Sequence, residues 1–267
     1  MENNTFKIVT LGCKVNSYES QGIEEYLLKN GFKESKDPEY IIVNTCAVTK
    51  TAEKKCLTKV RSLSEHFNAT KICVVGCSSS IRPEEFLNIP GVNVVSGNNG
   101  KLFAVKELLN GKTGLILSKK NTRNEKFEED IKISNFGKEC RAFVKIQDGC
   151  DNFCSYCIIP RTRGNSRSRS HEEIIEEVKR LYKSDYRELV ITGIDMGSYE
   201  DPNDDEYKLD DLIEDIIINT PDGYRIRISS LETSQMTQKL LDLFINHSDK
   251  LVSHVHIPLQ SGSSEIV

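Results

Sequence analysis

The sequence predicts an α/β protein made of two consecutive series of strands and helices. The first series should form a parallel, doubly wound sheet, and the second should form part of a βα barrel. Two observations predict this class. Short aliphatic runs alternate with segments of helical spacing along most of the chain, and a charged, weakly periodic stretch divides the alternation. We therefore expect domains at 1–118 and 141–267, joined by a linker at 119–140.

In the first domain, short runs of β-branched and aliphatic residues predict four main strands. They are residues 6–12, 40–45, 71–76 and 92–97, with an added strand at 114–118. Helical spacing predicts helices at 17–30, 49–67 and 101–109, and a short helix that begins at Pro83. Because strands and helices alternate, the strands should lie parallel.

The second domain repeats the same alternation. We expect strands at 142–147, 188–193, 224–229 and 254–258, and helices at 171–183, 209–219 and 237–247. Repeated units of this size are typical of a βα barrel, which closes with eight strands. Four units do not close it, so we expect that the chain is truncated at its C-terminal end.

Composition narrows the classes of function. Of the 267 residues, 37% are hydrophobic, and no apolar run approaches the roughly 20 residues of a membrane span. The polar N-terminus carries no signal-peptide pattern, so we expect a cytoplasmic protein with no membrane partner. The net charge of −4 excludes a wholly basic nucleic-acid binder. A local strip without acids could still bind phosphate, or be a solvated loop; it contains Arg161, Arg163, Arg167 and Arg169.

Nine cysteines are many for a reducing compartment, where clustered cysteines indicate metal or catalysis more often than disulfides. Cys150, Cys154 and Cys157 have the spacing CxxxCxxC, directly after the first strand of the second domain. Three thiolates on one loop can hold a four-iron cluster and leave one iron open. Zinc favours paired CxxC spacings and a fourth ligand, and three buried cysteines without metal are improbable in so polar a loop.

A second set of cysteines is dispersed in the sequence. Cys13, Cys46 and Cys77 each follow a predicted strand directly. Strands of a parallel sheet end at one edge, where ligands bind, so the three thiols should converge on a second site with one open iron. The residues that precede these cysteines are small or polar, which suits a crowded backbone near a bulky ligand; they are Gly12, Thr45 and Gly76.

The other three cysteines are not assigned to a cluster. Cys56 lies in the middle of a predicted helix, and Cys140 lies in the linker. Cys73 lies inside a predicted strand, where a cysteine usually behaves as a small buried hydrophobe.

The segments GCDNFCSYCIIPRTRGNSRSR, VITGID, RIRISSLE and HIPLQSGS, together with the two cysteine sets, resemble the radical S-adenosylmethionine methylthiotransferases. LGCKVN and ICVVGC look like the branch that acts on threonylcarbamoyladenosine in tRNA. The isopentenyladenosine branch more often shows a YGCQMN-like motif, and the ribosomal-protein branch an LGCPKN-like one. Two departures stand out. The run 78–80 is SSS instead of a tyrosine-alanine-glutamine run, and we expect that the truncated chain lacks the family's C-terminal RNA-binding module.

The resemblance implies transfer of a methylthio group to carbon 2 of N6-threonylcarbamoyladenosine, at position 37 beside the anticodon. It implies two four-iron clusters and S-adenosylmethionine as cofactors. Cys150, Cys154 and Cys157 would be the catalytic ligands of the radical cluster, and Cys13, Cys46 and Cys77 the ligands of an auxiliary, sulfur-bearing cluster. One S-adenosylmethionine would methylate the sulfur, and a second would be cleaved to the radical that removes the target hydrogen. The implied partners are the tRNA anticodon loop and an external electron donor such as flavodoxin or ferredoxin.

In the superfamily an aromatic residue before the third cysteine commonly contacts the adenine, and Tyr156 has this place here. Residues at the ends of the later strands should also contact S-adenosylmethionine, although each could simply cap its strand. They are Gly193, Arg227, Ser229, Ser230, Gln260 and Ser261. Three alternatives remain open: another methylthiotransferase substrate (isopentenyladenosine or a ribosomal protein), an iron–sulfur scaffold or electron carrier, and a zinc-binding structural protein.

Overall fold

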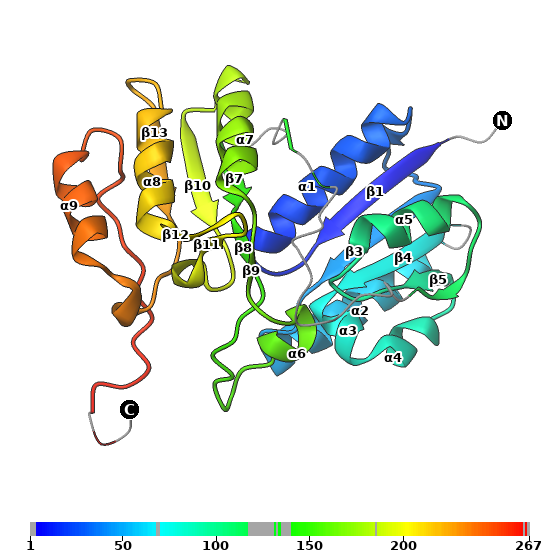
Figure 1. Ribbon diagram of the computed structural model, residues 1–267. Helices are drawn as coiled ribbons and strands as arrows, with labels where there is room; N and C mark the ends of the chain where they lie inside the picture. Colours follow the sequence, from blue (N-terminus) through cyan, green and yellow to red (C-terminus); the bar gives the residue numbers. More distant parts are fainter. Residues whose placement is uncertain are drawn as a thin grey trace. The chain divides into compact units, whose positions relative to one another are not determined.

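The computed structural model describes residues 4–67, 70–116, 131, 133–134, 140–184, 186–263 and 265, and it divides into two compact units (Figure 1). Unit 1 comprises Met1–Ile133 and Gly149–Asn165, and unit 2 comprises Ser134–Asp148 and Ser166–Val267. The loop that carries the CxxxCxxC cysteines therefore belongs to unit 1, although the sequence on both sides of it belongs to unit 2. None of the helices in these ranges is both long and apolar enough to span a membrane.

Unit 1 is built on one parallel sheet, as the alternation of elements predicts. Its strand order is β2-β1-β3-β4-β5-β6, and every neighbouring pair is parallel. The strands are β1 (Thr5–Thr10), β2 (Lys33–Glu34), β3 (Tyr40–Thr45), β4 (Lys71–Gly76), β5 (Val92–Val95) and β6 (Gly114–Leu115). The chain moves to one side of β1 to form β2 and to the other side to form β3. Open parallel sheets bind ligands at such a reversal, outside the carboxyl ends of the strands.

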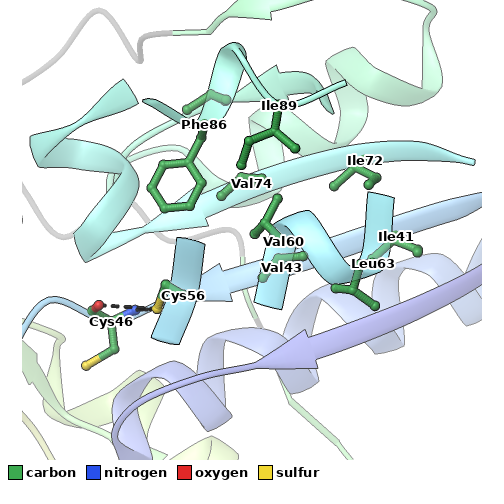
Figure 2. Packing of buried hydrophobic residues seen from close by; sticks show 11 residues of the cluster. Ile41, Val43, Cys46, Cys56, Val60, Leu63, Ile72, Val74, Phe86 and Ile89 are labelled. Atoms are coloured by element: carbon green, nitrogen blue, oxygen red, sulfur yellow. Dashed lines mark hydrogen bonds between the residues drawn. The ribbon is translucent and has the colours of Figure 1, made fainter. Parts of the chain in front are cut away.

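Helices cover both faces of this sheet. The helices of unit 1 are α1 (Lys14–Lys29), α2 (Lys50–His66), α3 (Cys77–Ile81), α4 (Pro83–Leu87), α5 (Lys101–Leu109) and α6 (Ile159–Arg163). Ile41 and Val43 of β3 pack in one cluster with residues of α2 and α4 (Figure 2). Side chains alternate along a strand, and Asn44 accordingly bonds to Ser20 of α1 and Lys101 of α5. The doubly wound arrangement is thus confirmed.

Unit 2 has a three-stranded parallel sheet in the order β13-β10-β7, so strands that follow one another along the chain lie side by side. This is the order expected for part of a βα barrel. The strands are β7 (Arg141–Lys145), β10 (Glu188–Thr192) and β13 (Arg225–Ile228), and the helices are α7 (His171–Lys183), α8 (Leu209–Ile218) and α9 (Gln238–Asn246). Unit 2 also contains two short antiparallel strand pairs. They are β8 (Gln147–Asp148) with β9 (Arg167–Ser168), and β11 (Glu200–Asp201) with β12 (Asp204–Lys208).

The strand expected at 254–258 does not form. Within 254–258 there is only the isolated bridge Ser230–His256, and a second one, Ile226–Leu251, lies just before the segment. Its apolar side chains Val255 and Ile257 remain 38% and 39% exposed, so little hydrophobic burial stabilises the pairing of this segment with β13. Of the strand expected at 114–118, β6 covers 114–115. Residues 117–118 and most of the expected linker at 119–140 lie outside the described ranges.

Candidate functional site

The three dispersed cysteines all lie at the carboxyl edge of the unit 1 sheet, beside the reversal of strand order. Cys13 is the N-cap of α1, Cys46 follows β3, and Cys77 is the first residue of α3, directly after β4. Burial raises the pKa of Cys46, a backbone hydrogen bond with Val48 opposes this, and the thiols of Cys77 and Cys13 raise it further. The three thiols are therefore close enough to interact electrostatically.

Two glycines make this approach possible. Gly12 has φ +121°, and a Cβ there would lie 2.8 Å from the Cβ and 3.0 Å from the Sγ of Cys46. Gly76 has φ +110°, and a Cβ there would lie 2.5 Å from the carbonyl oxygen of Thr45. Both positions combine a left-handed φ with no space for a side chain. The crowding expected near a bulky ligand is thus crowding against residues 45 and 46 themselves.

A fourth cysteine supports this edge without joining the thiol set. The Sγ of Cys56 accepts a hydrogen bond from the backbone N–H of Cys46 at 3.3 Å and donates to its carbonyl oxygen at 3.4 Å. Figure 2 shows that the Sγ of Cys46 points away from Cys56. Cys56 therefore fixes the backbone of Cys46. Cys73 is fully buried within β4, and burial raises the pKa of its thiol far above the usual range. Cys140 is exposed.

The second thiol set lies on the loop Gly149–Asn165, where Cys150, Cys154 and Cys157 are all half-buried. The base of the loop is closed by a hydrogen bond from the backbone N–H of Cys150 to the carbonyl oxygen of Gly164 at 3.1 Å. A turn links the other two cysteines, because the N–H of Cys157 donates to the carbonyl oxygen of Cys154 at 2.9 Å.

Aromatic side chains project from this loop. Phe153 has φ +48°, a left-handed conformation that is strained for a bulky residue, and it is 60% exposed. Tyr156, the expected adenine contact, is 71% exposed. Strained backbone of this kind is commonly found where a loop wraps around a functional group.

The donor chemistry of both sets fits iron–sulfur clusters. Each set offers three thiols, the soft ligands that hold such clusters. In one set sequence spacing brings the thiols together, and in the other the sheet does so. Cys46 and Cys77 are buried, whereas Cys13 is exposed, so the dispersed set has an open side.

A buried ion network holds the CxxxCxxC loop within unit 1. Arg163 of α6 donates from Nη1 to Glu19 Oε1 at 3.0 Å and from Nη2 to Asn16 Oδ1 at 2.7 Å. Lys101 Nζ donates to Glu19 Oε2 at 2.5 Å and to Asn44 Oδ1 at 3.0 Å. The side chains of Glu19 and Arg163 are 0% exposed, and that of Lys101 is 2% exposed. One carboxylate of α1 thus joins α5 to the loop.

The expected arginine strip is only partly a surface: Arg161 is exposed, and the other three arginines are paired with acids. Arg163 is buried in that network, and Arg169 is buried in an ion pair with Glu177 at 3.1 Å. Phosphate binding by these two side chains is therefore excluded in this conformation. Arg167 is half-buried and donates to Asp148 at 3.3 Å. Their acidic partners lie outside the strip, which is why the local sequence suggested uncompensated charge.

The residues expected at strand ends all lie in unit 2. Gly193 follows β10, and a Cβ there would lie 3.1 Å from Oε1 of Gln147, which accepts the backbone N–H of Asp195 at 2.8 Å. Gln147 therefore shapes the loop after β10, a role that its sequence position at the end of a predicted strand did not signal. Arg227 donates from Nε to Glu188 at 2.8 Å. This hydrogen bond, opposed by burial, holds the pKa of Glu188 below its usual value.

The remaining four expected residues follow β13 or lie near the end of the chain. The buried Ser229 donates its backbone N–H to Ile191 at 3.1 Å. The exposed Ser230 bonds to His256 Nδ1 at 2.6 Å. Gln260 is exposed, and Ser261 Oγ accepts the N–H of Ser263 at 3.1 Å. The three serines therefore have local structural contacts, and contact of all four residues with a cofactor stays a prediction.

Two family profiles match the chain. Residues 5–97 match the family described as "Uncharacterized protein family UPF0004", and residues 144–267 match the "Radical SAM superfamily".

Curated relatives match along almost the whole chain. "Threonylcarbamoyladenosine tRNA methylthiotransferase MtaB" of Bacillus subtilis is 36% identical over 97% of this chain and 58% of the relative. The protein of the same name from Chlamydia pneumoniae is 37% identical over 98% and 59%. "tRNA-2-methylthio-N(6)-dimethylallyladenosine synthase" of Thermodesulfovibrio yellowstonii is 31% identical over 100% and 62%. The chain thus spans less than two thirds of the length of these relatives.

Solved structures share the fold at low identity. The radical S-adenosylmethionine methyltransferase TsrM of Kitasatospora setae superposes with a TM-score of 0.64 at 12% identity, covering 98% of this chain and 60% of that one. The cobalamin-dependent S-adenosylmethionine radical enzyme OxsB has a TM-score of 0.64 at 15% identity, covering 99% and 45%.

Proposed function

Because the chain belongs to the radical S-adenosylmethionine methylthiotransferase family, we propose that it places a methylthio group on carbon 2 of N6-threonylcarbamoyladenosine in tRNA. The observation that carries this proposal is that one compact unit contains two sets of three thiols. A radical enzyme needs one such set, and the transfer of sulfur gives the second set a purpose.

The choice of nucleoside is supported by similarity and by one motif. The relatives named for threonylcarbamoyladenosine are 34–37% identical, and those named for dimethylallyladenosine are 30–32% identical. The LGCKVN motif around Cys13 favours the same branch. The competing substrate is N6-dimethylallyladenosine, the same nucleoside that is called isopentenyladenosine above.

Each thiol set has a distinct role in this proposal. Cys150, Cys154 and Cys157 hold a four-iron cluster with one open iron, and this cluster, when loaded with S-adenosylmethionine, supplies radical cleavage. Cys13, Cys46 and Cys77 hold the auxiliary cluster, which carries the sulfur.

Other residues of the chain would bind S-adenosylmethionine or position the cluster loop. Tyr156, which is 71% exposed, would contact the adenine. Gly193, where a Cβ would meet Met196 and Gln147, stays a predicted cofactor contact at the end of β10. Arg227 would have to leave Glu188 to meet a carboxylate. The Arg163–Glu19 pair keeps the cluster loop in place. We place the reaction in the cytoplasm, with flavodoxin or ferredoxin as the electron donor.

The test is a methylthiolation assay with the reconstituted chain, dithionite, S-adenosylmethionine and either of two tRNAs. One tRNA carries threonylcarbamoyladenosine and the other isopentenyladenosine, and mass spectrometry of the nucleosides detects the products. We expect the 2-methylthio product only with the first tRNA. Cys154→Ala should abolish it, and Cys140→Ala, at an exposed cysteine outside both sets, should not.

Product formed only on the isopentenyl substrate would replace the proposed nucleoside. Cleavage of S-adenosylmethionine without product on either tRNA, from a chain shown to bind both tRNAs, would refute the proposed substrate class.

A further inference from the structure

One side chain contacts both the dispersed thiol set and the loop of the other set. Asn98 follows β5 at the same edge of the sheet and is only 6% exposed. Its amide nitrogen Nδ2 lies 3.2 Å from Cys77 Sγ and 2.8 Å from the carbonyl oxygen of Thr162. Thr162 belongs to α6, five residues after Cys157, the last thiol of the loop.

The chemistry of the partners fixes the orientation of this amide. The carbonyl oxygen of Thr162 can only accept a hydrogen bond, so the amide nitrogen of Asn98 must face it. That nitrogen has two N–H groups, and the second is then available to Cys77 Sγ. The backbone N–H of Asn98 donates to Ser80 Oγ at 3.1 Å, which holds the residue in place.

The contact with Cys77 suits a thiolate. A thiol must lose its proton to bind iron, and a thiolate can only accept hydrogen bonds. The sulfur lies 3.6 Å from the Asn98 oxygen and 3.2 Å from the nitrogen. Only the shorter contact, from the donor, is favourable to a negatively charged sulfur.

We propose that Asn98 is a positioning residue for both clusters: it donates one hydrogen bond to the Cys77 sulfur of the auxiliary cluster and one to the loop that holds the radical cluster. This inference rests on the proposed function, because it requires that Cys13, Cys46 and Cys77 hold a cluster. Hydrogen bonds to cluster sulfurs disperse negative charge and favour the reduced state. Asn98 therefore raises the reduction potential of the auxiliary cluster while it holds α6 beside it.

The first experiment measures the potential of the auxiliary cluster alone. The background is the full chain with Cys150, Cys154 and Cys157 changed to Ala, reconstituted anaerobically and titrated with redox mediators under electron paramagnetic resonance. Asn98→Ala should shift the equilibrium about tenfold toward the oxidised cluster, which for a one-electron couple is a potential lower by about 59 mV. If that variant does not load, Asn98→Asp keeps the shape, turns the donor into an acceptor, and should shift the potential in the same direction.

A matched control is Asn93→Ala. Asn93 lies on β5, and its side chain accepts a backbone hydrogen bond from Ile72 at 3.0 Å. The substitution removes one hydrogen bond from the same sheet, so a general loss of stability would move both variants. We expect no shift of potential in this control.

The second experiment measures amide hydrogen exchange in α6 with all cysteines intact and no cluster loaded. The N–H groups of Thr162 and Gly164 donate within α6, and they should exchange faster in Asn98→Ala than in Asn93→Ala. A background chain without iron would refute the proposed auxiliary site. A loaded cluster with unchanged potential, or unchanged exchange in α6, would overturn the role of Asn98 and leave the proposed function intact.

Discussion

The buried network around Glu19 predicts an unusual order of mutational effects. Glu19 carries one negative charge and pairs with two buried cations, Lys101 and Arg163. Glu19→Gln removes the carboxylate that both cations share. Arg163→Met leaves the Lys101–Glu19 pair in place.

These charges set the magnitudes. Removing one partner of a buried pair leaves the other charge unpaired and costs about 3–5 kcal/mol, so Glu19→Gln should lower the free energy of unfolding by an amount in this range. Arg163→Met leaves no charge unpaired, but Glu19 and Asn16 lose the hydrogen bonds that Arg163 donates. Unsatisfied buried groups cost about 1–3 kcal/mol, so Arg163→Met should lower the free energy of unfolding by that smaller amount. Lys101→Met should resemble Arg163→Met.

The assay is native-state hydrogen exchange of the amides in β3 and β4, because a chain with two compact units need not unfold in one transition. Lys29→Met is the control. Lys29 pairs with Glu25 on α1 at 3.5 Å, but its side chain is 67% exposed, and such a pair contributes at most about 1 kcal/mol. A loss for Arg163→Met that equals or exceeds the loss for Glu19→Gln would refute the charge argument.

Two further predictions concern pH and backbone space. The hydrogen bond from Arg227 holds the pKa of Glu188 below its usual value, so its stabilising effect is present above the unfolded carboxyl pKa and is lost as the pH falls through the folded one. Glu188→Gln should therefore lower the melting temperature of unit 2 at pH 7 and have little effect in strong acid; a loss independent of pH would contradict this. Gly76→Ala should abolish iron loading at the dispersed thiols, because the added Cβ would lie 2.5 Å from the carbonyl oxygen of Thr45. The control is Gly31→Ala, at φ +84° with no atom within 4 Å of the added Cβ. It should cost only about 1–2 kcal/mol of backbone strain and leave iron loading intact. Equal iron loss in both variants would sink that explanation.

The sheet of unit 1 was predictable because burial on both faces leaves a continuous apolar run. YIIVNT and KICVVG match β3 and β4 residue for residue. The ends of these strands fixed the places of Cys46 and Cys77, and parallel pairing then required the thiols to share an edge. Elements without such a signal were not found. β2 has two residues, and α3 has five in the sequence CSSSI, too few for a helical period.

Long-range pairing was the other limit. The sequence shows four arginines close together, but Arg163 finds its carboxylate 144 positions away on α1. Nothing local to the strip reveals that partner. The same pairing explains why the loop Gly149–Asn165 belongs to unit 1. Asn98 was also missed, because an asparagine in SGNNG is typical of an ordinary turn.

The content of iron and acid-labile sulfide after anaerobic reconstitution tests the central claim most directly. It should be measured for this chain and for the variant in which Cys150, Cys154 and Cys157 are all changed to Ala. Two cubane clusters predict about eight irons in the parent and about four in the variant. About four irons in the parent and none in the variant would mean that Cys13, Cys46 and Cys77 hold no cluster, and the two-cluster account would be contradicted.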